Sequence, residues 1–99
     1  MEIVTSAQDI LNNISSELEA IVIDTETSSL HPWIYGKILA GIGVKPVSQD
    51  KSWYLPVRHN NSECAPVSEL FKLLNGIKNN TLIGHNIKFD LAVLYQEGV

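Results

Sequence analysis

A largely apolar run from Ala20 to Thr25 leads into two nearby carboxylates, Asp24 and Glu26. The run is rich in β-branched residues on consecutive positions, which is typical of a central strand covered on both faces. Along an extended backbone, Asp24 and Glu26 point to the same side, about 7 Å apart along the strand. Carboxylates this close repel each other, so we expect a partner that offsets the repulsion.

Helical spacing of apolar residues predicts three helices around this strand. The first is expected from Ser6 to Leu18, with a start that resembles a capping box. The second begins at Ser68 as N-cap and ends at Asn75-Gly76. The third follows Asn86 and stops near Gly98.

Three further strands are expected, over residues 36–46, 52–57 and 81–84. Pro56 within the second of these favours an edge position for it. The order predicts an antiparallel three-strand meander, followed by a crossover helix that returns a parallel strand beside the first. The expected fold class is therefore α/β, with a mixed sheet and flanking helices.

A third acid, Asp90, falls in the first turn of the last helix, where the helix dipole tolerates an anion. Asp24 and Glu26 lie at the carboxyl end of a parallel strand, where sites gather in open α/β sheets. We expect all three carboxylates to meet there around divalent cations, and oxygen ligands favour Mg²⁺ or Mn²⁺. A bare D-x-E pattern is common by chance, whereas its combination with Asp90 after a short strand is much rarer.

Length and charge limit the alternatives. The 99 residues allow one domain, residues 1–99, and the net charge of −4 argues against a broad basic face for duplex nucleic acid. Cys64 is the single cysteine, which excludes an intramolecular disulfide. The sequence has no apolar stretch of about 20 residues and no signal-peptide layout, so we expect a cytoplasmic protein with no membrane partner.

Two motifs resemble those of a known family. The stretch "VIDTETSSL" is similar to the first motif of the DEDD-type (DnaQ-like) 3′-5′ exonucleases, and "IGHNIKFDLAVL" resembles their second motif. The form is nearest to the proofreading domains of bacterial family A DNA polymerases. The intervening "SWYLPVRHN" also resembles the stretch before the crossover helix in that group, and the similarity runs from about Ala20 to the C-terminus.

The resemblance implies a ribonuclease-H-like fold and hydrolysis of the 3′-terminal phosphodiester of DNA by two Mg²⁺ or Mn²⁺ ions. Asp24 would bridge both ions, Glu26 would complete one, and Asp90 would hold the second. The resemblance further implies a single-stranded DNA 3′ end or a nucleoside monophosphate as ligand, contacted by Thr27, Leu30 and Asn86.

Structural roles remain open for several of these residues. Leu30 could pack under Trp33, and Asn86 could cap the last helix. His85 is more often structural than a ligand. Isolated basic residues usually only face solvent. Three of them in this sequence could nevertheless contact phosphates: Lys37, Arg58 and Lys88.

The sequence also departs from the family. A fourth carboxylate, preceded four residues earlier by Tyr or His, is absent up to Val99, and Glu97 lies too far from Asp90 to replace it. We therefore expect the N-terminal portion of an exonuclease domain, truncated before the fifth strand and weakly active or inactive alone. It would form part of a larger polymerase and self-associate through the exposed strand at residues 81–84.

Two other functions share these acids. One is a non-catalytic remnant that binds nucleotides or serves as a structural module of a polymerase-associated exonuclease fold. The other is an RNA-trimming relative of the same superfamily, which differs locally in reading the 2′-hydroxyl.

Overall fold

A computed structural model describes residues 1–28, 38–59 and 63–98. It contains a five-stranded mixed sheet with the strand order β1-β4-β3-β2-β5. The strands are β1 (Glu2–Ile3), β2 (Ile21–Thr27), β3 (Leu39–Pro46), β4 (Trp53–Pro56) and β5 (Leu82–Ile83). The helices are α1 (Ala7–Leu11), α3 (Val67–Ile77) and α4 (Ile87–Gln96). The sheet and the helices confirm the predicted α/β class.

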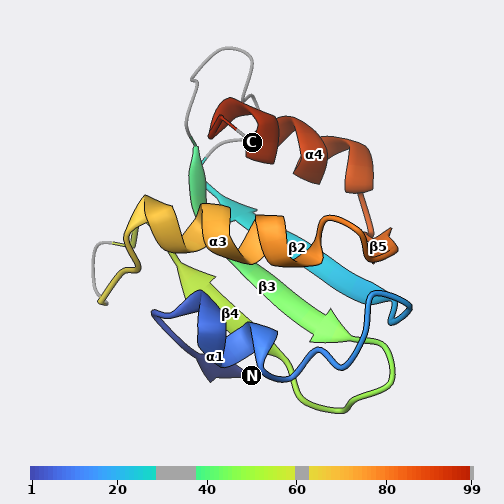
Figure 1. The fold of residues 1–99 in the computed structure, drawn as a ribbon. Helices are drawn as coiled ribbons and strands as arrows, with labels where there is room; N and C mark the ends of the chain where they lie inside the picture. Colours follow the sequence, from blue (N-terminus) through green and yellow to red (C-terminus); the bar gives the residue numbers. More distant parts are fainter. Residues whose placement is uncertain (29–37, 60–62, 99) are drawn as a thin grey trace.

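The predicted topology around β2 is also confirmed. β2 pairs antiparallel with β3, β3 pairs antiparallel with β4, and β5 pairs parallel with β2. In the sequence, α3 connects β4 to β5, and it crosses the sheet on the way. α4 follows β5 (Figure 1). β5 lies at the end of the strand order, as predicted, whereas self-association through it stays a prediction.

The edge position predicted for the strand at Pro56 is wrong. β4 lies between β3 and β1, because the two residues of β1 pair with it in parallel. The backbone N–H of Glu2 donates to the carbonyl of Ser52, and that of Val4 donates to the carbonyl of Tyr54. A strand of two residues has no periodicity that a sequence pattern could reveal. The edge strand next to β4 is therefore β1, near the N-terminus.

Two helix boundaries also differ from the prediction. α1 ends at Leu11, and Leu18 is 96% exposed, so the helical spacing beyond residue 11 does not continue the helix. α3 begins at Val67, after Pro66 as N-cap, and runs through the Asn75-Gly76 pair to Ile77. Gly76 stays helical where Leu11 packs on it, at a distance that leaves no room for a Cβ atom.

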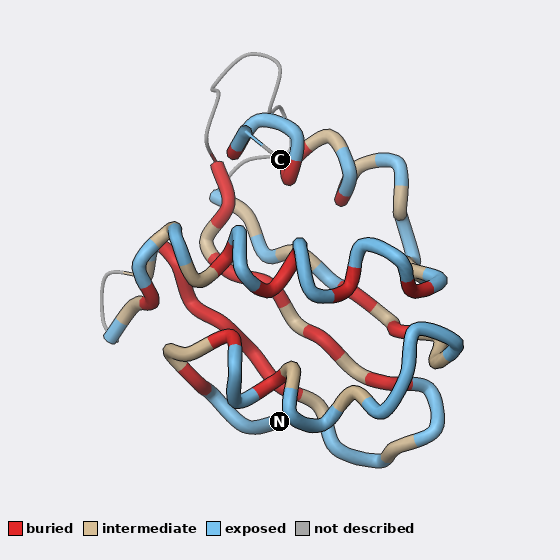
Figure 2. The backbone as a smooth tube through the Cα atoms, viewed as in Figure 1, coloured by how far each residue is buried: buried red, intermediate tan, exposed pale blue. Residues whose placement is uncertain are grey.

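The core lies between the helices and one face of the sheet. Buried and less buried residues alternate along β2, whereas every residue of β4 is buried (Figure 2). All three helices contribute to the same core. Its fully buried large side chains are Ile10, Ile21, Ile23, Leu39, Ile42, Val44, Leu55, Leu70, Leu73, Ile77 and Val93. The other face of the sheet carries Asp24 and Glu26.

Candidate active site

β2 presents Asp24 and Glu26 on the face of the sheet that is opposite to the core. Ile21 and Ile23 are buried against the helices, and both acids are exposed because side chains alternate along a strand. The prediction that the two carboxylates share one side is therefore confirmed. They line a pocket of about 140 Å³ together with Met1, Val22, Gly43, Val44, Lys45, Ser52 and Tyr54.

Asp90 approaches β2 from the other face. It lies in the first turn of α4, is only 4% exposed, and its Oδ1 accepts a hydrogen bond of 2.5 Å from the Thr25 hydroxyl. The backbone N–H of Thr25 lies 3.4 Å from the same oxygen. Oδ2 packs against Gly84, where an added Cβ atom would lie 2.8 Å away. Through Thr25, Asp90 thus anchors the part of β2 that lies between the two exposed acids.

The expected meeting of Asp24, Glu26 and Asp90 around divalent cations is not found in the described part of the chain. No group of three or more His, Cys, Asp or Glu side chains there could hold a metal ion. The physical reason is the alternation of β2: Thr25, the partner of Asp90, points away from its two acidic neighbours. A shared role of all three acids as metal ligands stays a prediction.

Tyr54 is the aromatic residue of this pocket, and no local sequence pattern indicated a role for it. The residue is 6% exposed, and its ring lies across Gly41, where a Cβ atom would overlap the phenol oxygen. The hydroxyl lies 2.6 Å from His59 Nε2, and the two rings meet edge to face at 89°. Burial, together with the negative charge of Glu26, raises the pKa of Tyr54 to about 12.

The strand end next to Glu26 is irregular. Glu26 pairs with Gly41 but Thr27 pairs with Leu39, so β3 carries one extra residue, Ala40. The carbonyl of Ala40 accepts the N–H groups of Val57 and Arg58 instead. Such bulges re-aim side chains at strand ends. Thr27, predicted to contact substrate, is half-buried just beyond this irregularity.

The other predicted substrate contacts are placed as follows. Asn86 is exposed and makes no side-chain capping hydrogen bond, so the interpretation of its side chain as a helix cap is wrong. It borders a surface hollow on α4 with Lys88, Phe89 and Ala92. Leu30, like Trp33, lies outside the described residues.

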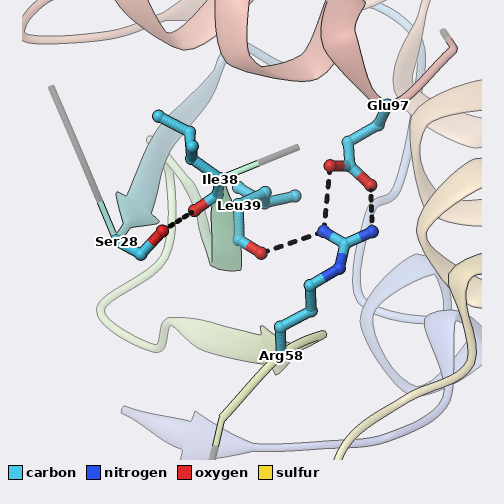
Figure 3. A network of polar contacts seen from close by, with 5 residues as sticks. All are labelled: Ser28, Ile38, Leu39, Arg58 and Glu97. Carbon is cyan, nitrogen blue, oxygen red and sulfur yellow. Dashed lines mark hydrogen bonds and ion pairs between the residues drawn. The ribbon is translucent and has the colours of Figure 1, made fainter. Parts of the chain in front are cut away.

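Arg58 contacts the end of α4, so it is not simply a residue that faces solvent or phosphate. Its guanidinium forms two hydrogen bonds with the Glu97 carboxylate, of 2.9 and 2.7 Å, and a third of 3.1 Å with the carbonyl of Leu39 (Figure 3). The Glu97 side chain is only 1% exposed. The pair ties the end of α4 to the start of β3, next to the contact between Ser28 and the Ile38 carbonyl.

With this geometry established, comparison with known proteins identifies the family. Over residues 1–99 the chain matches the family model described as a 3′-5′ exonuclease, the DnaQ-like proofreading domain of family A DNA polymerases. The chain belongs to this exonuclease family. A search of the curated proteins found no match. In the helices that the structure describes, none is long and apolar enough to cross a membrane.

Exonucleases of this family normally use divalent metal ions. In this exonuclease domain, Asp24 and Glu26 fit such an ion, because both are exposed, both line the same pocket, and carboxylate oxygens are the donors that Mg²⁺ and Mn²⁺ prefer. Asp90 does not fit the same set, because its carboxylate is bound to Thr25. The open face of β2 is therefore the candidate cation site.

Proposed function

We propose that this exonuclease domain hydrolyses the 3′-terminal phosphodiester of a DNA strand and releases nucleoside monophosphates, as a proofreading domain does. The observation that carries the proposal is the position of Asp24 and Glu26. Both acids lie side by side on the open face of β2, in one pocket, in a chain of the 3′-5′ exonuclease family.

Two Mg²⁺ or Mn²⁺ ions are the proposed cofactors. Asp24 and Glu26 would hold the ion of the open face, whereas Asp90, on the other face of β2, would hold a second ion only after giving up its hydrogen bond with Thr25. When bound, such ions supply Lewis-acid activation of water and neutralise the charge of the phosphate. That neutralisation also removes the repulsion between the two neighbouring acids of β2.

The residues around the acids have separate proposed parts. Lys45 lines the same pocket and brings a positive charge toward an incoming phosphate. The hydrogen bond from Thr25 to Asp90 holds the backbone between the two acids against α4, which limits their movement. Thr27, Leu30 and Asn86 are the proposed contacts of the terminal nucleotide.

The test is release of a labelled mononucleotide from the 3′ end of single-stranded DNA, with Mn²⁺ or Mg²⁺ present. We expect slow release by the wild type, none after removal of the metal with a chelator, and none in Asp24→Asn. Asp50→Asn is a matched control, because Asp50 is an exposed acid outside the pocket of Asp24. Absence of any metal-dependent release, together with Mn²⁺ binding that is equal in wild type and Asp24→Asn, would contradict the proposal.

A parallel reaction with an RNA strand of the same sequence tests the DNA preference. We expect faster release from DNA. Faster release from RNA would replace the proofreading function by RNA trimming, because the 2′-hydroxyl is the local difference between the two strands.

A further inference from the structure

We propose that Lys45 forms a second phosphate subsite in the pocket of Asp24 and Glu26, and that it binds the phosphate next to the scissile one in a DNA strand. The inference rests on the proposed function and deepens it, because it states which part of the strand the cationic end of the pocket takes. No local sequence pattern indicated this role for Lys45.

The sheet register places Lys45 on the open face, one step away from the acids. Asp24 pairs with Gly43, and Lys45 follows two residues later on β3. Lys45 therefore stands diagonally across from Asp24 and on the same face, because side chains alternate along a strand. Diagonal neighbours in an antiparallel pair are about 7–8 Å apart. The pocket thus has a carboxylate end and an ammonium end.

The floor between the two ends is a glycine. A Cβ atom on Gly43 would meet no atom closer than 3.6 Å, so the space above this residue is open. A larger side chain at this position would fill that space and separate Lys45 from Asp24. Its absence leaves a continuous surface on which a sugar–phosphate backbone can lie from the acids to Lys45.

The ammonium group of Lys45 lacks a strong partner of its own. The residue is half-buried, and among the described residues its Nζ donates a long hydrogen bond, of 3.4 Å, to the carbonyl of Pro46. Within the same part of the chain, the ion pair is that of Arg58 with Glu97, and Lys45 forms none. An ammonium group has three donors, and a partly desolvated one is stabilised by an anion that accepts them. Lys45 is thus available to a charged ligand.

Ser52 adds a hydroxyl to the same end of the pocket. It lines the pocket with Lys45. It directly precedes Trp53, the partner of Val44 on β3, so it continues the register beside Lys45. Its carbonyl accepts the backbone N–H of Glu2, which ties this position to β1. Lysine and serine side chains are both common donors to phosphate oxygens, so a phosphate is the ligand that fits this end.

The proposed reaction decides which phosphate this is. The scissile phosphate belongs at the carboxylate end, where the divalent cations would bind. A strand that is cleaved at its last phosphodiester carries its further phosphates on the 5′ side only. Lys45 therefore takes the phosphate one nucleotide to the 5′ side, and the strand runs from the acids of β2 toward the end of β3.

The test compares two thymidine dinucleotides that differ in one group, a 5′-phosphate or a 5′-hydroxyl. With Mn²⁺ present, we expect the wild type to bind the 5′-phosphorylated dinucleotide about tenfold more tightly, because a hydrogen bond between charged groups is gained. Lys45→Met should bind both dinucleotides with nearly equal affinity. Lys45→Arg keeps the positive charge and should keep most of the difference. Calorimetric titration measures all these affinities.

Mn²⁺ binding without a dinucleotide gives a second measurement with the opposite sign. Lys45→Met removes a positive charge close to the acids, so Mn²⁺ affinity should rise by about two- to fivefold at low ionic strength. A purely structural role of Lys45 would lower both affinities instead. Lys72→Met removes an exposed lysine of α3 and is the control, which should change neither measurement.

Three results would contradict the inference while the proposed function stands, provided that Asp24→Asn weakens Mn²⁺ binding. The first is a wild type that does not distinguish the two dinucleotides. The second is a Lys45→Met variant that keeps the wild-type preference for the 5′-phosphate, and the third is weaker Mn²⁺ binding in that variant. If Asp24→Asn and wild type bind Mn²⁺ equally, the proposed function fails, and the assignment of the phosphate fails with it.

Discussion

The two faces of the central sheet differ in almost every physical respect, although the same strands build both. On the core face, Ile21, Ile23, Ile42 and Val44 are at most 1% exposed. On the open face, glycines stand across from Asp24 and Glu26, and polar groups line a pocket. Core packing and the candidate site therefore use alternate residues of one strand, so substitutions one position apart should have different effects.

The core face should give the largest loss of stability. Ile23→Ala removes a side chain that is 1% exposed and leaves a cavity under the helices. We expect the free energy of unfolding to fall by about 3 kcal/mol in denaturant titration. Val22→Ala is the matched control from the open face, because Val22 is half-buried and should cost clearly less. Equal losses at positions 22 and 23 would break the distinction between the faces.

The tie at the end of α4 should give the next largest effect. Arg58→Met leaves the Glu97 carboxylate buried without its cation and the Leu39 carbonyl without a donor. We expect a loss of about 2 kcal/mol in the free energy of unfolding. Lys72→Met, an exposed change on α3, should stay close to wild type. A loss in Arg58→Met no greater than in Lys72→Met would show that the pair contributes nothing net.

The link between the two faces should give a smaller effect. Thr25→Val keeps the shape of the side chain but removes the hydroxyl that donates to Asp90. Asp90 is 4% exposed, and we expect a loss of about 1 kcal/mol in thermal or denaturant unfolding. Thr81→Val tests an exposed threonine just before β5 as control. Unchanged stability in Thr25→Val would mean that Asp90 is held by other contacts.

The open face should give the smallest effect on stability and the largest on metal binding. Asp24→Asn removes one of two repelling charges at an exposed position, so the free energy of unfolding should change by no more than about 0.5 kcal/mol. Mn²⁺ affinity should nevertheless fall by more than about tenfold, because the change removes a proposed metal ligand. Calorimetric titration measures the affinity. A large loss of stability would place Asp24 among the structural residues instead.

The sequence was sufficient to predict structural features that are determined within a single strand or helix. The apolar run before Asp24 predicted the central strand, and period-two alternation put Asp24 and Glu26 on one face. The spacing of Leu70, Leu73 and Leu74 predicted the crossover helix, and β5 beside β2 followed from its connection. The strand and the helix depend on residues close together in the chain, whereas the pairing of β5 with β2 followed from the rule for crossover connections.

The sequence was insufficient where residues far apart meet. Gly76 signals a helix end locally, yet it lies inside α3, which ends at Ile77, and the Leu11 side chain packs against it. Ser6 signals a cap, yet the nearby Ala7 N–H donates to Glu69 of α3. Tyr54 gained its place only through the register of three strands and the gap at Gly41, and Arg58 through its pairing with Glu97. None of these contacts has a local sequence pattern.

Paramagnetic line broadening by Mn²⁺ in ¹H-¹⁵N spectra tests the central claim most directly, because the broadening falls steeply with distance from the ion. The account predicts that substoichiometric Mn²⁺ first broadens the amide signals of Asp24, Glu26 and Gly43, and that Asp24→Asn abolishes this selectivity. Strongest broadening at another acidic group, such as Glu17 and Glu19, with Asp24 and Glu26 unaffected, would contradict it.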